Sequence, residues 1–235
     1  MNSDSDNSDN SGSRRGAFLP LLIALSLMLI LIPLSESFPL MYTVLGSLVL
    51  LSGMPAVLSD RSFRMTAGAA LVICLPLRWA AHFLGHQSPI LILLSHVTVL
   101  IYFMILAAVV LVRVIAHPQV TRQTVIGAIC GYLLIGYIFT SGYSVLTYLE
   151  PGSISVGGQP LGVEQADHVE QHLSELSYFS FASLTTVGYG DIVPVTPFAR
   201  AIAVVEALVG QLYLAGFVAR LVGALGSSVP RQHED

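Results

Sequence analysis

Seven consecutive residues at positions 185–191, TTVGYGD, have the residue types and spacing that most directly indicate chemistry in this chain. An extended Thr-Val-Gly-Tyr-Gly strand can turn several main-chain carbonyls, together with a threonine hydroxyl, toward one axis. Gly188 and Gly190 are needed because successive carbonyls point to one side only if some residues adopt backbone angles closed to side-chain-bearing residues. Four such strands around one axis would replace the hydration shell of a cation. The run therefore predicts a cation-coordinating strand.

The segments on either side of this run fit such a strand. Residues 174–184 (SELSYFSFASL) are apolar and aromatic, and they predict a short helix with Ser174 as its N-cap. A helix of this length cannot span a bilayer, which takes about 20 residues. Downstream, two prolines interrupt the chain before a long apolar helix predicted at residues 198–225. A glycine-rich turn in a soluble loop is the alternative interpretation, and the order of these segments argues against it.

The strand and its flanks resemble the signature of the tetrameric potassium-channel family of pore-loop cation channels, and the resemblance is strong from Tyr178 to about Gly210. It implies a selectivity filter of five residues: Thr186, Val187, Gly188, Tyr189 and Gly190. Potassium ions, the permeant ligand, are expected at the first four of these. Thr185 and Asp191 would flank the filter, with Asp191 at the outer mouth.

Two residues of the last apolar segment are also candidate site residues. An ionisable group inside a spanning helix is costly and faces protein or water, so we expect Glu206 to contact the short helix or the back of the filter. Relatives in the resembled family often have a flexible glycine where this chain has Gly210, which implies a gating hinge. Close packing of helices is the alternative role for Gly210.

Composition predicts an all-α integral membrane protein. The 235 residues are 54% hydrophobic and only 10% charged, whereas soluble domains usually carry about 25% charged residues. The net charge of −4 gives no indication of a nucleic-acid partner. Both cysteines lie in apolar segments, so no disulfide framework is predicted. We expect no cofactor besides the permeant potassium ions, and no nucleophile–base pair supports an enzyme.

Six apolar runs predict six transmembrane helices, with the short helix and the filter re-entering the membrane between the fifth and the sixth. The runs are residues 17–34, 38–58, 65–84, 90–112, 124–148 and 198–225. A signal peptide is the alternative for the first run. The predicted organisation is a disordered tail (1–16), a four-helix amino-terminal region (17–115), a pore domain (122–226) and a short tail (227–235).

Arginine placement predicts the orientation of these helices. Arginines precede the first run and lie between the second and third runs, between the fourth and fifth, and at the end of the sixth: Arg14, Arg15, Arg61, Arg64, Arg113, Arg122, Arg220 and Arg231. The alternate loops contain no arginine and hold several carboxylates. The positive-inside rule then places both termini in the cytoplasm, with the filter mouth outside the plasma (inner) membrane.

The fourth run, residues 90–112, contains no arginine or lysine. A voltage sensor needs several basic residues at three-residue spacing there, so strong voltage gating is not expected. Arg78 in the third run is the one buried basic candidate, and we expect it to reach toward the outer end of its helix.

A second candidate site lies in the loop before the short helix. His168 and His172 are four residues apart, and Glu164 shares their face if this stretch is helical. Such a set predicts an external metal or pH-sensing site, and a solvated loop face is the alternative.

The resemblance implies a homotetramer that conducts potassium passively, as a six-helix, prokaryotic-type member without a voltage-sensor arginine array. Membrane lipid and other copies of the chain are the expected partners. The alternatives are a potassium transporter subunit and a non-conducting regulatory membrane subunit. Transporters with filter-like loops resemble four fused pore units, whereas this chain has a single filter.

Overall fold

The computed structural model describes residues 18–36, 38–58, 64–84, 88–116, 120–162 and 172–226. Its helices are α2 (Leu19–Leu31), the 3-10 helix η1 (Ile32–Glu36), α3 (Pro39–Ser52), α4 (Met54–Leu58), α5 (Arg64–Leu84), α6 (Pro89–Ala116), α7 (Arg122–Leu149), α8 (Leu173–Leu184) and α9 (Pro197–Gly226). Its strands are β1 (Ile154–Val156), β2 (Gln159–Pro160) and β3 (Ile192–Pro194). The predicted tails lie outside the described residues.

Four helices of the described chain are long and apolar enough to cross a membrane: α5, α6, α7 and α9. They correspond to the last four predicted spans. The first two predicted spans are shorter as helices, because α2 has 13 residues and α3 has 14. α2 gives way to η1, which contains Pro33, and Gly53 separates α3 from α4 just before Pro55. A proline has no amide hydrogen to donate to the preceding turn of an α-helix, which is consistent with both interruptions.

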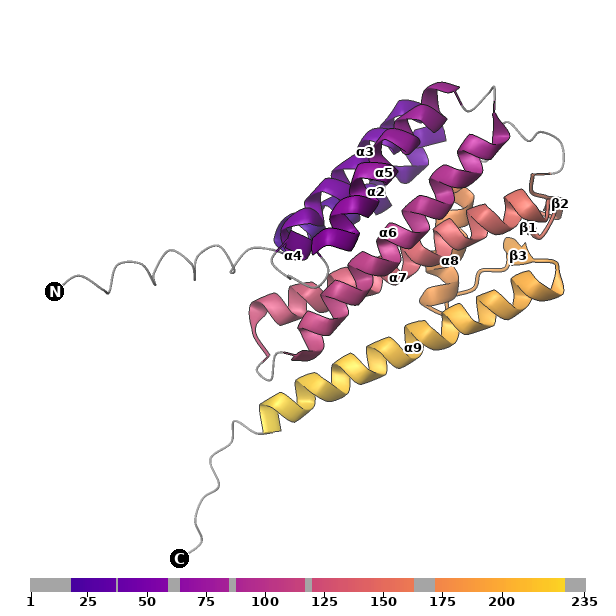
Figure 1. Ribbon diagram of the computed structural model, residues 1–235. Helices are drawn as coiled ribbons and strands as arrows, with labels where there is room; N and C mark the ends of the chain where they lie inside the picture. Colours follow the sequence, from indigo (N-terminus) through magenta and orange to yellow (C-terminus); the bar gives the residue numbers. More distant parts are fainter. Residues whose placement is uncertain are drawn as a thin grey trace, which may run out of the picture.

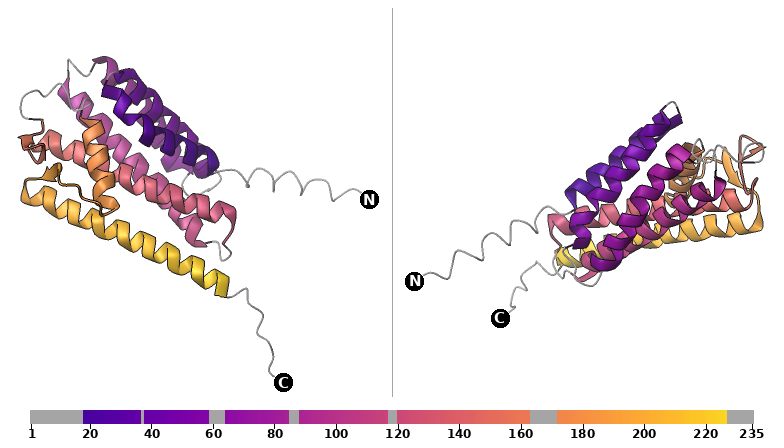
Figure 2. Two further views of the ribbon diagram at one scale, coloured as in Figure 1. Left: turned by 180° about the vertical axis from the view of Figure 1, so that it is seen from behind. Right: turned by 45° about the horizontal axis from the view of Figure 1, so that its top comes forward.

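The helices form two groups around α6 and α7. In Figure 1, α2, α3 and α5 lie together on one side of α6 and α7, and α9 runs along the opposite side. Seen from behind in Figure 2, α8 lies between α7 and α9, and it packs against both of them. Two tyrosine hydroxyls link α6 and α7 to α2 and α3. Tyr137 of α7 donates to the Leu25 oxygen of α2 at 2.9 Å, and Tyr102 of α6 donates to the Leu50 oxygen of α3 at 2.6 Å. A buried tyrosine thus finds the polar partner that it needs.

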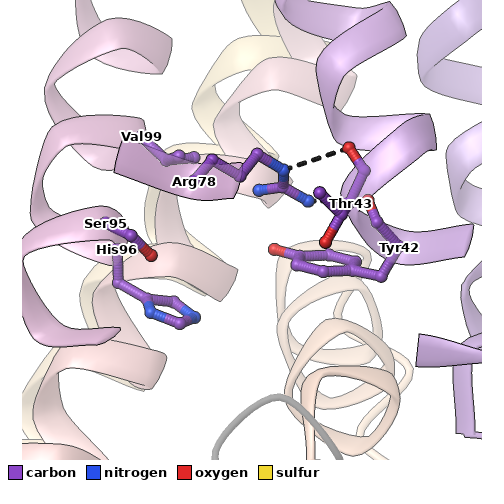
Figure 3. Close-up of a pocket in the computed structure, with 6 residues that line it drawn as sticks. All are labelled: Tyr42, Thr43, Arg78, Ser95, His96 and Val99. Atoms are coloured by element: carbon purple, nitrogen blue, oxygen red, sulfur yellow. Dashed lines mark hydrogen bonds between the residues drawn. The ribbon is translucent and has the colours of Figure 1, made fainter. Parts of the chain in front are cut away.

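Arg78 is buried, and its guanidinium bonds to the first part of α3 instead of reaching solvent at the end of α5. Its guanidinium points at α3, where Nη2 donates to the Tyr42 oxygen at 2.6 Å and Nε donates to the Thr43 oxygen at 3.3 Å (Figure 3). The guanidinium carbon also lies 4.2 Å from the centre of the Tyr42 ring. A side chain at Gly46 would collide with the guanidinium, so this glycine leaves the space that Arg78 occupies. The carbonyl oxygens of α3 and the face of the Tyr42 ring interact with the charged guanidinium, so Arg78 can be buried.

A small antiparallel sheet lies at one end of the molecule, and the all-α expectation missed it. Its strand order is β2-β1-β3, with Val156 paired to Gln159 on one side and to Ile192 on the other. Gly157 and Gly158 form the two-residue turn between β1 and β2, with φ of 57° and 87°. Both residues of such a hairpin turn need positive φ, which explains the glycine pair. The sheet joins the chain that leaves α7 to the chain that enters α9.

Candidate ion-coordinating site

α8 is the support on which the candidate strand is built. It begins at Leu173 with His172 as its N-cap, so the predicted cap at Ser174 was wrong by two residues. One face of α8 is buried between α7 and α9 and includes Leu176, Ser180 and Leu184. The apolar members of this face fix the helix, while Ser180 carries a hydroxyl into the same interface. The end of α8 is therefore held by packing on both sides.

The strand turns its amide groups back onto the end of α8. The Thr185 and Thr186 amides donate to the Phe181 and Ser183 oxygens at 3.0 and 2.9 Å. The Val187 and Gly188 amides both donate to the Ala182 oxygen, at 2.9 and 3.2 Å. In the described part of the chain, the carbonyls of residues 186–190 accept no hydrogen bond from protein. Since main-chain carbonyls need partners, these oxygens are left available to ligate a cation.

The backbone of the strand alternates in handedness. Thr186, Gly188 and Gly190 have φ of 59°, 52° and 83°, so every second residue is left-handed. In a regular strand, successive carbonyls point to opposite sides. Carbonyls can all point to one side only if the backbone geometry changes at every second residue, as it does here. The sequence predicted the need for glycine at positions 188 and 190, but it did not predict the left-handed backbone of Thr186. A threonine in this conformation costs on the order of 1 kcal/mol, which the bonds to α8 offset.

The side chains of the strand are exposed in a single chain. Val187 and Tyr189 are 52% and 73% exposed. Tyr189 is packed in part, because its ring stacks on Tyr178 of α8 with centroids 6.1 Å apart and planes 8° apart. The described chain thus covers one side of the strand and leaves the other side open.

Asp191 lies where the strand ends and β3 begins. Its Oδ1 accepts a hydrogen bond from the Tyr178 hydroxyl at 3.2 Å, and its main-chain oxygen accepts from the Gly157 amide at 2.9 Å. The second bond attaches the strand to the hairpin turn of the sheet. Both ends of the strand are consequently anchored, one by α8 and one by the sheet.

The structure places Glu206 of α9 against α8, as expected from its position in the sequence. Its Oε2 accepts from the Tyr143 hydroxyl of α7 at 2.7 Å, and its Oε1 lies 2.5 Å from the Ser180 hydroxyl oxygen. The side chain is fully buried, at 0% exposure. Sequence reasoning missed Tyr143 and Ser180 as its partners, and the one signal available for Ser180 was a hydroxyl on a mainly apolar helix, a signal that it shares with the buried Ser177.

Gly210 lies one helical turn after Glu206 and touches the end of α8. A side chain there would collide with the main-chain oxygen of Leu184, which also accepts a hydrogen bond from the Tyr132 hydroxyl at 3.3 Å. The contact gives Gly210 a packing role in this structure. The hinge role remains a prediction.

The candidate external metal or pH site is described only in part, because Glu164 and His168 lie outside the described residues. His172 Nδ1 lies 3.7 Å from Glu175 Oε1. Partial burial opposes ionisation of Glu175, but the His172 side chain and hydrogen bonding to the backbone outweigh burial, so the pKa of Glu175 lies below its usual range. Within the described ranges, no three His, Cys, Asp or Glu side chains gather as a metal site would require.

Comparison with known proteins agrees with this geometry. Residues 153–226 match the family model described as an ion channel. The matched segment runs from the start of the sheet to the end of α9, so it contains the supporting helix, the strand and the long helix that follows. Comparisons with curated proteins and with solved structures gave no match. The match makes residues 153–226 similar to an ion channel domain, and together with the four long apolar helices it supports a membrane protein.

Proposed function

We propose that this protein is a potassium-selective channel that conducts the ion passively across the plasma membrane through a homotetrameric pore. The observation that carries the proposal is the strand at residues 186–190, whose carbonyls accept no hydrogen bond from the described residues and whose backbone is left-handed at every second position. The sequence Thr-Val-Gly-Tyr-Gly supports potassium as the ion, because carbonyl cages of this kind replace its hydration shell.

The placement of α8 supports a cation at this site. The carboxyl end of a helix carries a partial negative charge from its unpaired carbonyls. α8 ends at Leu184, directly before the strand, so its negative end lies at the inner start of the proposed filter. This partial charge favours binding of a cation at the carboxyl end of α8, next to the start of the strand.

The exposure of α9 supports assembly of several copies. The most apolar 18-residue window of α9 is only 11% buried, whereas that of α7 is 61% buried. Each chain carries one filter strand with an open side, and a closed ring of oxygens needs four of them. A homotetramer would cover the open sides of both the strand and α9.

The basic residues of α5 and α6 support a weak dependence of conduction on voltage. α6 has no arginine or lysine before Arg113 in its last turn, and Arg78 of α5 is bonded to the backbone of α3. A sensor needs several charges that move through the field, each contributing about 2.3 kcal/mol per 100 mV. We infer that both termini are cytoplasmic from the arginine distribution.

The experiment is ion flux from potassium-loaded liposomes that contain the purified protein, with sodium and barium as comparisons. We expect passive potassium flux, a low sodium flux and block by barium. Gly188→Ala must hold a φ of 52° with a side chain, so flux should fall at least about tenfold if each of four chains bears about 1 kcal/mol.

The matched control is Gly158→Ala, since Gly158 also has positive φ and open space around it but lies in the hairpin turn. Flux in this variant should stay within about twofold of the unmodified protein. Energy-coupled uptake against a gradient would favour the transporter alternative. Equal sodium and potassium flux, or an assembly of two or three chains, would overturn the proposal.

A further inference from the structure

Glu206 lies where three helices of the pore half meet. Tyr143 of α7 donates to its Oε2 at 2.7 Å, and the Ser180 hydroxyl oxygen of α8 lies 2.5 Å from its Oε1. The same Ser180 oxygen lies 2.8 Å from the main-chain oxygen of Gly136 in α7. One carboxyl group and one hydroxyl group therefore connect α7, α8 and α9.

The number of hydrogens in this cluster depends on whether Glu206 carries a proton. A serine hydroxyl has one hydrogen, while a carbonyl and an ionised carboxylate can only accept. If Glu206 is ionised, Ser180 can donate to Glu206 or to Gly136, and the other close oxygen–oxygen contact has no hydrogen. If Oε1 carries a proton, Glu206 donates to Ser180 and Ser180 donates to Gly136. Only the carboxylic acid provides a separate hydrogen for each contact.

The surroundings of Glu206 also favour the neutral form. The side chain has 0% exposure, and in the described part of the chain it forms hydrogen bonds but no ion pair. The titratable groups that face it are Tyr143 and Tyr132, both from α7, and α8 presents Ser180. An uncompensated buried carboxylate costs several kcal/mol. Since the chain itself covers Glu206, a neighbouring copy in a tetramer could not contact it.

The cluster lies one helical turn from the start of the filter strand. Ser180 and Leu184 are one turn apart on α8, and their partners Glu206 and Gly210 are one turn apart on α9. The two helices therefore run in the same direction in a fixed register. A change at the first contact is transmitted along α8 to Leu184, which directly precedes the strand.

We propose that Glu206 is a neutral carboxylic acid at neutral pH, and that its proton holds α8 in register with α9, so that ionisation at alkaline pH loosens the filter strand and reduces conduction. The proton leaves to solvent hydroxide, and Ser180 then has two acceptors and one hydrogen. Glu206 acts here as a positioning residue. Its effect on conduction rests on the proposed channel function.

The test compares the unmodified protein with Glu206→Gln in the liposome flux assay. The glutamine amide can donate to Ser180 and accept from Tyr143, so it mimics the neutral acid but does not titrate. We expect the unmodified protein to lose at least about fivefold in flux between about pH 7 and about pH 9, the equivalent of about one hydrogen bond. Glu206→Gln should retain its flux over that range. Equal alkaline loss in both proteins would overturn the proposal.

Infrared spectroscopy of the same samples gives a readout that does not depend on conduction. At neutral pH the unmodified protein should show a carbonyl band of a protonated carboxyl group, which disappears in Glu206→Gln and on alkalinisation. The matched control is Glu150→Gln, which removes an exposed carboxylate that accepts from the Thr196 hydroxyl at 3.1 Å and should leave the band unchanged.

The two readouts separate the two proposals. If neither protein conducts potassium but the band behaves as expected, the channel function is wrong and the neutral Glu206 stands. If potassium flux is present but Glu206→Gln leaves the carboxyl band unaltered, Glu206 is ionised and the inference is wrong. In that case Ser180 donates to Glu206, and Gly136 keeps the Thr140 hydroxyl, 2.9 Å away, as its side-chain donor.

Discussion

The two long helices that pack against α8, α7 and α9, have similar lengths but opposite surroundings. α7 has 28 residues and α9 has 30, yet the most apolar window of α7 is 61% buried and that of α9 is 11% buried. α7 packs against α2, α6, α8 and α9, whereas α9 meets the rest of the chain mainly at α7, α8 and β3. Most of the α7 window is covered by its own chain, whereas most of the α9 window is left for lipid or further copies to cover.

The residues at the contacts explain this difference. Small residues let neighbours approach the backbone of α7: side chains at Gly127, Gly131 and Gly136 would collide with Val114, the Tyr213 hydroxyl and the Phe181 ring. Small residues are typical of helix interfaces in membranes. Along α9, Gly216 and Gly223 have no neighbour within 4 Å of an added side chain, and Gly210 is in close contact with α8.

The largest expected effect comes from Gly210→Ala, which places a methyl group against the main-chain oxygen of Leu184. Overpacking against backbone costs about 1–3 kcal/mol or more, and α8 cannot move without moving the filter strand. We expect a large loss of thermal stability and of potassium flux. The control Gly68→Ala on α5 also has open space around the added side chain and should change neither measurement. A shift in gating without loss of stability would instead support the hinge prediction.

An intermediate effect is expected when a tryptophan is placed on the exposed face of α9. Leu212 on α9 and Val72 on α5 are exposed to similar extents, 71% and 72%. If copies of the chain cover α9, Leu212→Trp should disrupt assembly, with a cost of about 1–3 kcal/mol per contact. Native mass spectrometry of the detergent-purified protein measures the result. Val72→Trp should leave the assembly intact, and the same outcome for Leu212→Trp would mean that lipid covers this part of α9.

The smallest expected effect concerns the start of α8. The pKa of Glu175 lies below its usual range, so its ionised form contributes stability above its usual pKa and loses that contribution as the pH falls through the lowered pKa. Glu175→Gln should remove this acid dependence in thermal unfolding. The effect should stay below about 1 kcal/mol, because the side chains of His172 and Glu175 are 32% and 30% exposed. An unchanged acid dependence would show that another group causes it.

The strand at residues 186–190 and its neighbouring helices were predictable because their signals are local. The order of short helix, Gly188–Gly190 strand and long apolar helix is read directly from residue types, and α8 and α9 begin and end within two residues of prediction. The β1–β2 hairpin was predictable in principle, because the Gly157–Gly158 pair followed by a polar residue fits a two-residue turn.

Contacts between distant segments were not predictable in the same way. Arg78 is buried because Gly46, 32 positions earlier, leaves room for its guanidinium, and no pattern in α5 alone indicates that space. The partners of Glu206 come from two other helices, since Tyr143 and Ser180 are 63 and 26 positions away. A single sequence shows that an ionisable residue in a spanning helix needs partners, but the register between helices decides which they are.

The pairing of β1 with β3 has a consequence for how order can be lost near the filter. The segment that enters α8 and the segment that leaves the filter strand are bonded edge to edge, with Val156 opposite Ile192 and the Gly157 amide on the Asp191 oxygen. The strand is therefore bonded to its own chain at both ends and has no free end. The sheet opposes fraying from the far end and the bonds to α8 oppose fraying from the Thr185 end, so a loss of order in the strand has to start between its two anchored ends.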